Sequence, residues 1–396
     1  MAERMPHNPG WHLAPGFEPV AEVFAELLAL GLDLGATFAV SLEGECVVDL
    51  WGGHRDDGLT RPIERDALFP VWSATKGATA TTIALLVDRG VLDYDAPVAR
   101  YWPEFAASGK ERLTVGEMLS HQAGLCGMRR PTTIEDHYAH HRLAAELAAQ
   151  APFFPPASAW GYHALTFGIL ADELVRRVDG RPVARVFQED LAGPLGLELF
   201  MGLPPAELDR QVTITPPPGR QQALVEIPNP AAFEAAFQNP VLEGGMANTT
   251  AWKLAGIPGA GLGGNARGLA RLYALHANNG VLDGRRWLSA PTVAAARSQR
   301  VEGVDQVTGN YRRWAAGFHL NMHGLMGPNP DAFGHAGWGG SIGFADPAGR
   351  LAVGYTTNRM LVSPPGELDQ RLSELLAAIY AALDARKPPS QSAAKR

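Results

Sequence analysis

Cysteine, lysine and long apolar runs are all scarce in this 396-residue sequence. Two cysteines, Cys46 and Cys126, are too few for a disulfide framework or a cysteine-rich metal module. No stretch reaches the ~18 apolar residues that a membrane-spanning helix needs. Residues 1–16 lack the apolar segment of a secretory signal, so we expect a cytoplasmic protein.

Basic charge is not in excess either. The chain has 34 Lys and Arg against 41 Asp and Glu, which gives a net charge of -7 and argues against a dedicated nucleic-acid or anionic-membrane surface. The composition, 46% hydrophobic and 19% charged, is typical of a globular enzyme. The only lysines are Lys76, Lys110, Lys253, Lys387 and Lys395.

Strand patterns lie near both ends of the sequence. Residues 35–52 contain two β-rich runs and predict a hairpin. Residues 341–345 and 350–357 predict two more strands joined by a turn. Apolar residues at helical spacing predict a first helix over 20–30 and a last helix over 368–385.

The simplest arrangement pairs the terminal strands in one antiparallel sheet. The first and last helices then cover one face of that sheet. The prediction is an α+β fold whose core domain comprises residues 1–85 and 290–386. A mainly helical subdomain is inserted at residues 86–289, and residues 387–396 are predicted to be a disordered tail. We expect a site in the cleft between sheet and insertion.

Ser73-Ala-Thr-Lys76, at the start of a predicted helix, is the first candidate for chemistry. Residues three apart share a helix face, so the Lys76 amine can reach the Ser73 hydroxyl. Burial that keeps this amine neutral would let it activate the serine, and free N–H groups at the helix start could hold an oxyanion. The alternative is a capping serine beside a solvated lysine. The scarcity of lysine and the apolar helix after Lys76 argue against that alternative.

A tyrosine and a glycine-rich stretch are further candidates. Tyr162 precedes a predicted helix and could offer a phenol whose pKa is shifted by a nearby ammonium, although a packed ring is the simpler interpretation. Residues 334–343 lead into a strand and suggest that a ligand approaches the backbone closely, with a β-bulge or turn as the alternative.

Three other patterns lack the context that their chemistry requires. Gly339-Gly-Ser-Ile-Gly343 matches a nucleophile elbow, but a strand and a turn are predicted after it instead of a helix. Gly259-Ala-Gly-Leu-Gly-Gly264 matches a dinucleotide-binding loop, but no predicted strand precedes it. His137, His140 and His141 match no metal motif, and a solvated helix face is the better interpretation. We therefore predict neither metal nor cofactor.

Three blocks of the sequence resemble a known superfamily. They are Phe69-Pro-Val-Trp-Ser-Ala-Thr-Lys-Gly77, Tyr101-Trp-Pro-Glu-Phe105 and Leu113-Thr-Val-Gly-Glu-Met-Leu-Ser-His-Gln-Ala-Gly-Leu125. The chain resembles, over about residues 20–385, the serine β-lactamase-like and penicillin-binding-protein-like superfamily. Within the class C-related branch it looks most like the family VIII carboxylesterases.

The resemblance implies a fold of antiparallel sheet, flanking helices and a helical subdomain. It implies Ser73 as the acylated nucleophile, Lys76 as its base and Tyr162 as the residue that passes protons to the leaving group. It also implies an oxyanion hole made by the N–H of Ser73 and the N–H of a strand residue.

The third family motif, Lys-Thr-Gly in β-lactamases, can be aligned in two ways. At His335-Ala-Gly337 it makes Trp338 the strand donor, and at Trp338-Gly-Gly340 it makes Ser341 the donor. Either way the lysine is absent, and Tyr162-His-Ala164 lacks the asparagine of the class C Tyr-x-Asn motif. Both losses disfavour an efficient β-lactamase and resemble the ester-hydrolysing branch.

The sequence therefore predicts a metal-independent serine esterase that acts on short-to-medium-chain or aryl carboxylic esters through an acyl-enzyme. The alternatives are a β-lactamase, a D-amino peptidase or amidase, an acyltransferase, and a catalytically silent penicillin-binding-like ligand module. A small-molecule ester is the expected partner, nucleic acid and membranes are not, and the sequence fixes no oligomeric state. The residues expected to line the pocket are Phe153, Phe154, Trp160, Trp338, Gly339 and Gly340.

Overall fold

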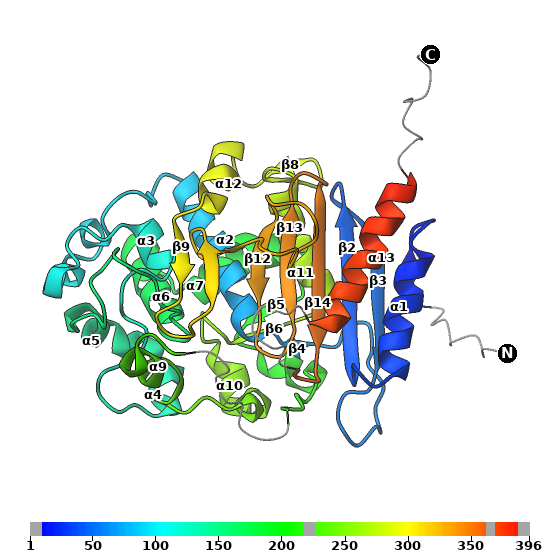
Figure 1. The fold of residues 1–396 in the computed structure, drawn as a ribbon, viewed down its shortest axis with the longest axis horizontal. Helices are drawn as coiled ribbons and strands as arrows, with labels where there is room; N and C mark the ends of the chain where they lie inside the picture. Colours follow the sequence, from blue (N-terminus) through cyan, green and yellow to red (C-terminus); the bar gives the residue numbers. More distant parts are fainter. Residues whose placement is uncertain (1–9, 218–225, 362–368, 387–396) are drawn as a thin grey trace, which may run out of the picture.

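A nine-stranded antiparallel sheet dominates the computed structural model, which describes residues 10–217, 226–361 and 369–386 (Figure 1). In spatial order its strands are β1 (His12–Leu13), β3 (Glu45–Gly53), β2 (Gly35–Leu42), β14 (Leu351–Thr357), β13 (Ile342–Asp346), β12 (Phe333–Ala336), β11 (His319–Leu320), β10 (Tyr311–Trp314) and β9 (Val301–Val304). Strands β2 and β14 pair with Ala36 opposite Thr357 and Leu42 opposite Leu351. The two ends of the chain thus share one sheet, which confirms the predicted α+β fold.

The terminal helices α1 (Glu18–Ala29) and α13 (Gln370–Arg386) lie side by side on one face of this sheet (Figure 1). Phe24 and Leu27 of α1 and Leu375 and Ile379 of α13 are buried in one apolar cluster with strand residues such as Phe38. Apolar residues three or four positions apart form the buried stripe of each helix. The predicted tail at 387–396 lies outside the described residues.

Helix α11 (Ala266–Ala277) also packs against β2, β13 and β14. A Cβ atom at Gly354 would lie 2.1 Å from the carbonyl oxygen of Ala266, so this glycine lets the helix approach β14 closely. The predicted boundary at residue 289, which places α11 in the inserted subdomain, stays a prediction. The contacts of α11 are with strands of the large sheet.

The remaining helices lie mostly at the end of the sheet away from α1 and α13 (Figure 1). Helix α2 (Thr75–Asp88) is buried on every side from Thr75 to Leu86 and contacts α6, α7, α12 and β12. The other helices are α3 (Val115–Leu119), α4 (Ile134–Tyr138), α5 (Ala144–Ala149), α6 (Thr166–Asp179), α7 (Val183–Phe187), α8 (Gly193–Leu195), α9 (Pro230–Phe237), α10 (Thr250–Ala255) and α12 (Ala290–Arg297). Two small sheets consist of β4 (Phe69–Pro70), β6 (Leu262–Gly264) and β5 (Leu199–Met201), and of β7 (Val281–Leu282) and β8 (Arg285–Arg286).

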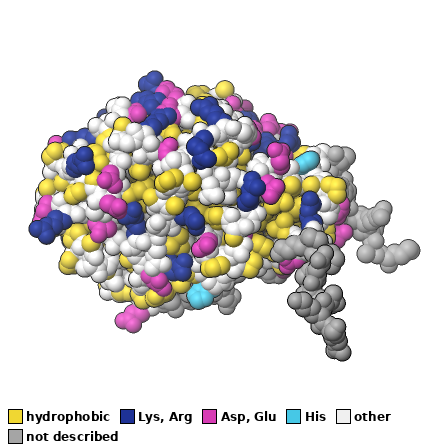
Figure 2. Space-filling view, turned by 90° about the horizontal axis from the view of Figure 1, so that it is seen from above, with side chains coloured by type: hydrophobic (Ala, Val, Ile, Leu, Met, Phe, Trp, Pro, Cys, Tyr) yellow, Lys and Arg dark blue, Asp and Glu magenta, His cyan; other side chains and the backbone are white. Residues whose placement is uncertain are grey.

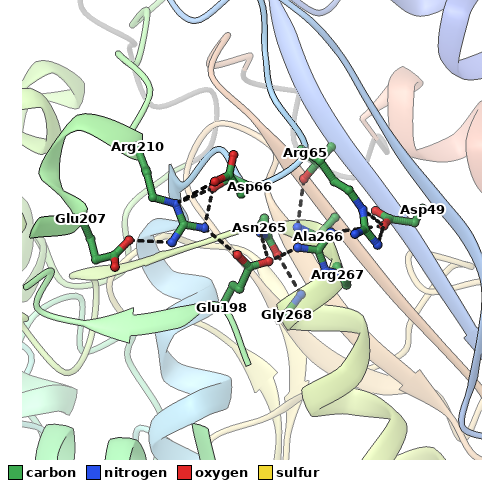
Figure 3. A network of polar contacts seen from close by, with 11 residues as sticks. Asp49, Arg65, Asp66, Glu198, Glu207, Arg210, Asn265, Ala266, Arg267 and Gly268 are labelled. Atoms are coloured by element: carbon green, nitrogen blue, oxygen red, sulfur yellow. Dashed lines mark hydrogen bonds and ion pairs between the residues drawn. The ribbon is translucent and has the colours of Figure 1, made fainter. Parts of the chain in front are cut away.

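A network of polar contacts ties α11 to the large sheet and to the β5 region (Figure 3). Arg267 of α11 contacts Asp49 of β3 at 3.1 Å and also pairs with Glu198. Arg65 pairs with Asp49 at 2.8 Å, and Arg210 pairs with Glu198 at 2.5 Å. The network connects segments that are far apart in sequence.

The surface mixes charges of both signs. Figure 2 shows Lys and Arg side chains interspersed with Asp and Glu over the face in view. None of the helices in the described ranges is long and apolar enough to cross a membrane.

Candidate active site

Ser73 lies in a short 3-10 turn, Trp72–Ala74, that leads directly into α2. Strand β4 precedes the turn and pairs with β6. The turn is also hydrogen-bonded to the same strand pair, because the N–H of Val71 donates to Leu262 O at 3.1 Å. These contacts fix the position of the half-buried Ser73 at the start of the central helix.

Trp72, immediately before Ser73, has a left-handed φ of +49°, which is rare for a bulky residue. Its buried ring lies against Trp252, with ring centres 4.9 Å apart, and against Trp338, with ring centres 5.1 Å apart. Packing on both rings therefore maintains a strained backbone beside the candidate nucleophile.

Lys76 is completely buried in the first turn of α2. Its Nζ lies 3.1 Å from Ser73 Oγ and within 2.9 Å and 2.8 Å of the carbonyl oxygens of Ala164 and Gly259. A neutral amine has two N–H donors and one lone pair, so it can donate to both carbonyls and accept the proton of the Ser73 hydroxyl. Burial lowers the pKa of Lys76 well below its ordinary value of 10.5, which favours this neutral form.

The two carbonyls that hold Lys76 are functional groups that sequence reasoning missed. Gly259 opens the Gly259–Gly264 stretch, and a Cβ atom at Gly168 of α6 would lie 2.3 Å from the Gly259 backbone nitrogen. The glycines thus permit close backbone packing that presents a carbonyl to Lys76. The concentration of glycine signals close approach, but the approaching group is a lysine rather than a ligand phosphate.

Tyr162 completes a contact set around Ser73. Lys76 Nζ lies 4.8 Å from the centre of the Tyr162 ring. Burial raises the pKa of Tyr162, while the nearby Ser73 side chain acts in the opposite direction. The phenol is therefore protonated at neutral pH, and burial rather than a nearby ammonium governs its titration.

Asp305 holds the backbone of Tyr162, and no sequence motif marks it as part of the site. The buried Asp305 accepts the N–H of Tyr162 at 2.9 Å and the N–H of Val307 at 2.8 Å through Oδ1. The residue directly after β9 therefore helps to hold the backbone of Tyr162 in position.

The third motif reaches the site through β12. His335 donates its Nδ1 proton to Ala336 O at 2.7 Å, and burial together with the nearby Lys76 lowers the pKa of His335 well below 6.5. The imidazole is therefore neutral at neutral pH. It offers no fixed positive charge at the place where β-lactamases have lysine.

Gly337 and Trp338 lie directly against the Ser73 turn. A Cβ atom at Gly337 would lie 2.0 Å from Val71 O, so only glycine allows this approach. Trp338 follows it and packs its ring on Trp72. This placement favours the alignment at His335-Ala-Gly337, with the Trp338 N–H as the strand donor.

Gly339 and Gly340 are closely packed on one side. A Cβ atom at Gly339 would meet Met360 at 2.6 Å, and one at Gly340 would meet the Arg371 guanidinium at 2.3 Å. Their backbone as part of the substrate pocket stays a prediction. Ser341 Oγ accepts the N–H of Thr357 at 3.4 Å.

The predicted aromatic walls fall into different clusters. Phe153 and Phe154 share an apolar cluster with Tyr162, and Trp338 shares one with Trp72. Trp160 is only 2% exposed and packs on Trp314, with ring centres 5.8 Å apart. Phe153 borders a cavity of about 450 Å³ beside α9, and Trp160 borders one of about 260 Å³ beside β9.

The histidine cluster in and after α4 is not a solvated face, which corrects the sequence interpretation. His137 is 2% exposed, and His140 is 9% exposed and contacts Asp172 at 3.2 Å. Only His141 is exposed. Within the described part of the chain, no three His, Cys, Asp or Glu side chains are grouped so that they could hold a metal ion.

Comparison with known proteins identifies the family. The beta-lactamase family model matches residues 20–378. The chain belongs to the beta-lactamase family. Esterase/beta-lactamase LipL of Mycobacterium tuberculosis is 38% identical over 357 residues, which cover 88% of this chain and 82% of LipL. Esterase EstB of Burkholderia gladioli is 30% identical over 393 residues, which cover 91% of this chain and 94% of EstB.

Solved structures of this family agree in fold. A family VIII carboxylesterase is 43% identical, with a TM-score of 0.88 and coverage of 94% of this chain and 98% of that chain. A penicillin-binding protein homologue from Caulobacter crescentus is 41% identical, with a TM-score of 0.87 and the same coverage. The family therefore includes both esterases and penicillin-binding-like proteins at similar distance from this chain.

Proposed function

We propose that this protein is a serine carboxylesterase that forms an acyl-enzyme on Ser73. The observation that carries the proposal is the contact set of Lys76, whose fully buried amine meets Ser73 Oγ and two carbonyl oxygens. Relatives and solved structures named as esterases, 30–43% identical, support the same activity.

The protonation states of Lys76 and Tyr162 suggest how acylation proceeds. The Lys76 lone pair takes the Ser73 hydroxyl proton while Oγ bonds to the ester carbonyl carbon. The N–H groups of Ser73 and Trp338 stabilise the resulting oxyanion. When the carbon–oxygen bond to the alcohol breaks, the protonated Tyr162 phenol gives its proton to the alcohol, and the Lys76 ammonium then returns a proton to the phenolate.

Deacylation uses Lys76 and Ser73 again. Water gives one proton to the neutral Lys76 amine as its oxygen attacks the acyl carbon. The acyl–oxygen bond to Ser73 breaks, and the serine recovers its proton from the ammonium. Both groups end in their starting states, so the cycle requires no metal or cofactor.

An ester without a carboxylate next to the reacting carbonyl fits this site better than a β-lactam does. The neutral His335 supplies no positive charge for a substrate carboxylate. Ala164 supplies a backbone carbonyl to Lys76 where the class C motif has an asparagine. The apolar rings of Phe153 and Phe154, clustered with Tyr162, and of Trp338, clustered with Trp72, favour short-to-medium acyl or aryl groups.

β-Lactam hydrolysis is the second candidate, because the 38% identical LipL is named both an esterase and a β-lactamase. We expect it to be a slow side activity. A cytoplasmic location also belongs to the proposal and is supported by Cys46 and Cys126, which are both unpaired thiols.

Parallel assays of p-nitrophenyl acetate, p-nitrophenyl butyrate, nitrocefin and a D-alanyl anilide test the proposal. Rapid ester hydrolysis with slow or no nitrocefin turnover is expected, and Ser73→Ala should abolish both. A fluorophosphonate probe should label Ser73. Efficient turnover of nitrocefin or the anilide without ester turnover would contradict the carboxylesterase assignment, and absence of probe labelling would indicate a silent ligand module.

A further inference from the structure

The loop Gly337–Ser341, which carries the candidate oxyanion donor Trp338, is held on two opposite sides. On one side Gly337 and Trp338 contact the Ser73 turn, as described above. Inside the loop, the N–H of Gly337 donates to Ser341 O at 2.6 Å and the N–H of Gly340 donates to Gly337 O at 3.2 Å. These bonds make the loop compact.

On its other side the loop rests on Arg371 of α13. Arg371 Nη2 donates to Gly339 O at 3.0 Å, and the guanidinium fills the space beside Gly340. Leu361 N–H also donates to Gly339 O, at 3.2 Å. The guanidinium therefore lies directly behind the segment that presents Trp338 to Ser73.

Every N–H group of Arg371 has an acceptor. Nε and Nη2 donate to the two carboxylate oxygens of Asp369 at 3.0 and 2.6 Å, and Nη1 donates to Asp33 Oδ1 at 3.0 Å. Nη1 also donates to Arg359 O at 2.8 Å and Nη2 to Gly339 O at 3.0 Å. The side chains of Arg371 and Asp33 are both 0% exposed. A lysine has only three donors and no planar fork, so it cannot satisfy this set.

Asp33 is itself oriented by side chains of β14. Tyr355 donates its hydroxyl to both Asp33 oxygens, at 2.8 and 2.7 Å, and the Thr357 hydroxyl donates to Oδ1 at 2.6 Å. The Thr357 N–H in turn donates to Ser341 Oγ at 3.4 Å. Arg371, the middle of the loop at Gly339 and its end at Ser341 thus share one buried network.

We propose that Arg371 is a positioning residue for catalysis, which sets the position of the Trp338 N–H by holding the far side of the Gly337–Ser341 loop. The inference rests on the proposed function. An oxyanion donor stabilises the transition state only when it is already in place, and a displacement of about 1 Å near a reacting centre can cost about 100-fold in rate. Arg371 therefore acts on kcat rather than on substrate binding.

The test compares Arg371→Lys and Arg371→Met with wild type, using p-nitrophenyl butyrate and enzyme quantified by fluorophosphonate titration. We expect kcat per titrated site to fall about 10–100-fold while KM changes less than about threefold. The inhibition constant of phenylboronic acid should rise by a similar factor, because its tetrahedral adduct needs the same N–H. Asp369→Asn, which weakens the hold on the guanidinium, should show the same effect more weakly.

Arg267→Met is the matched control, since Arg267 also pairs with two carboxylates, Asp49 and Glu198. It should lower thermal stability and leave kcat per titrated site within about twofold of wild type. The inference is overturned if Arg371→Lys and Asp369→Asn both keep wild-type kcat and boronic acid inhibition, even with lower melting temperatures. If wild type itself does not hydrolyse the ester, the proposed function fails instead, so the two failures are distinguishable.

Discussion

Two buried basic side chains serve the Ser73 region, and their surroundings differ. Lys76 contacts Ser73 directly, whereas Arg371 contacts the loop that carries Trp338. Lys76 and Arg371 are both 0% exposed. The hydrogen bonds described for Lys76 go to a hydroxyl and two carbonyls, and burial is what shifts its pKa. Arg371 instead meets the carboxylates of Asp33 and Asp369.

The difference teaches how burial assigns a role. A buried charge without a counter-ion is costly, so lysine responds by losing its proton and becomes a base. A guanidinium retains its charge in proteins and needs carboxylates when it is buried. The same burial therefore makes Lys76 suited to proton transfer and Arg371 suited to fixing a loop.

The largest effect is expected when the side chain of Lys76, the proposed base, is replaced. Lys76→Met should lower kcat about 10⁴-fold or more, comparable to Ser73→Ala, because the groups of such a unit act together. The measurement is kcat for p-nitrophenyl butyrate with enzyme quantified by absorbance.

Lys110→Met is the matched control for this substitution. Lys110 is also buried and donates to two carbonyls, Ala107 O at 2.6 Å and Gln150 O at 2.9 Å, but it lies at the end of a separate turn. The substitution should reduce stability by about 1–3 kcal/mol and leave kcat within about twofold of wild type. Equal loss of activity in both variants would show that Lys76 only supports the fold.

Tyr162→Phe tests the proposed acid separately from the base Lys76. It removes the phenol hydroxyl and keeps the packed ring. A positioned acid contributes about 10²–10⁴-fold, so kcat should fall within that range while the melting temperature changes little. The loss should be smaller for p-nitrophenyl esters than for alkyl esters, because p-nitrophenolate leaves without a proton. An equal loss for both ester types would remove Tyr162 from the leaving-group step.

The pH profile of kcat/KM tests the protonation state of Lys76 without a mutation. Protonation of Lys76 blocks its lone pair, so kcat/KM should rise with pH as this amine loses its proton. Because the pKa of Lys76 is lowered well below 10.5, this rise should be complete well below that pH. The raised pKa of Tyr162 keeps the phenol protonated across the plateau. A profile that rises only near pH 10.5 would contradict a neutral buried lysine.

Ser341→Ala should have the smallest effect among the site variants. Ser341 lies in the elbow-like pentapeptide, but the strands β13 and β14 follow it where a nucleophile elbow has a helix. Its Oγ accepts a weak hydrogen bond from Thr357. We expect kcat to change less than about 10-fold, through a small displacement of the loop. Loss of fluorophosphonate labelling at Ser73 in this variant would contradict the assigned roles.

Much of the architecture could be read from local patterns. Alternating strands at both ends and amphipathic terminal helices predicted the closed sheet, and the spacing of Ser73 and Lys76 predicted their contact on one helix face. The contact of helix α11 with the sheet was not predicted, because the amphipathic pattern of a helix does not show which layer covers it.

The rest of the site depends on contacts between distant segments. The carbonyls of Ala164 and Gly259 are 88 and 183 residues from Lys76. Backbone carbonyls occur at every position and leave no mark on the sequence. Arg371 is 32 residues from Gly339, and nothing in its local pattern separates it from the exposed Arg386 of the same helix. Tertiary packing alone assigns these groups to the site.

The most direct test of the account is an NMR titration of the lysine Nζ atoms. The chain has only Lys76, Lys110, Lys253, Lys387 and Lys395, so ¹⁵N-lysine labelling gives a spectrum of five side chains, and Lys76→Met identifies the resonance of interest. The account predicts that Lys76 Nζ loses its proton well below pH 10.5, over the same pH range in which kcat/KM rises. A Lys76 ammonium that persists to pH 10.5 or above while the enzyme is fully active at neutral pH would contradict it.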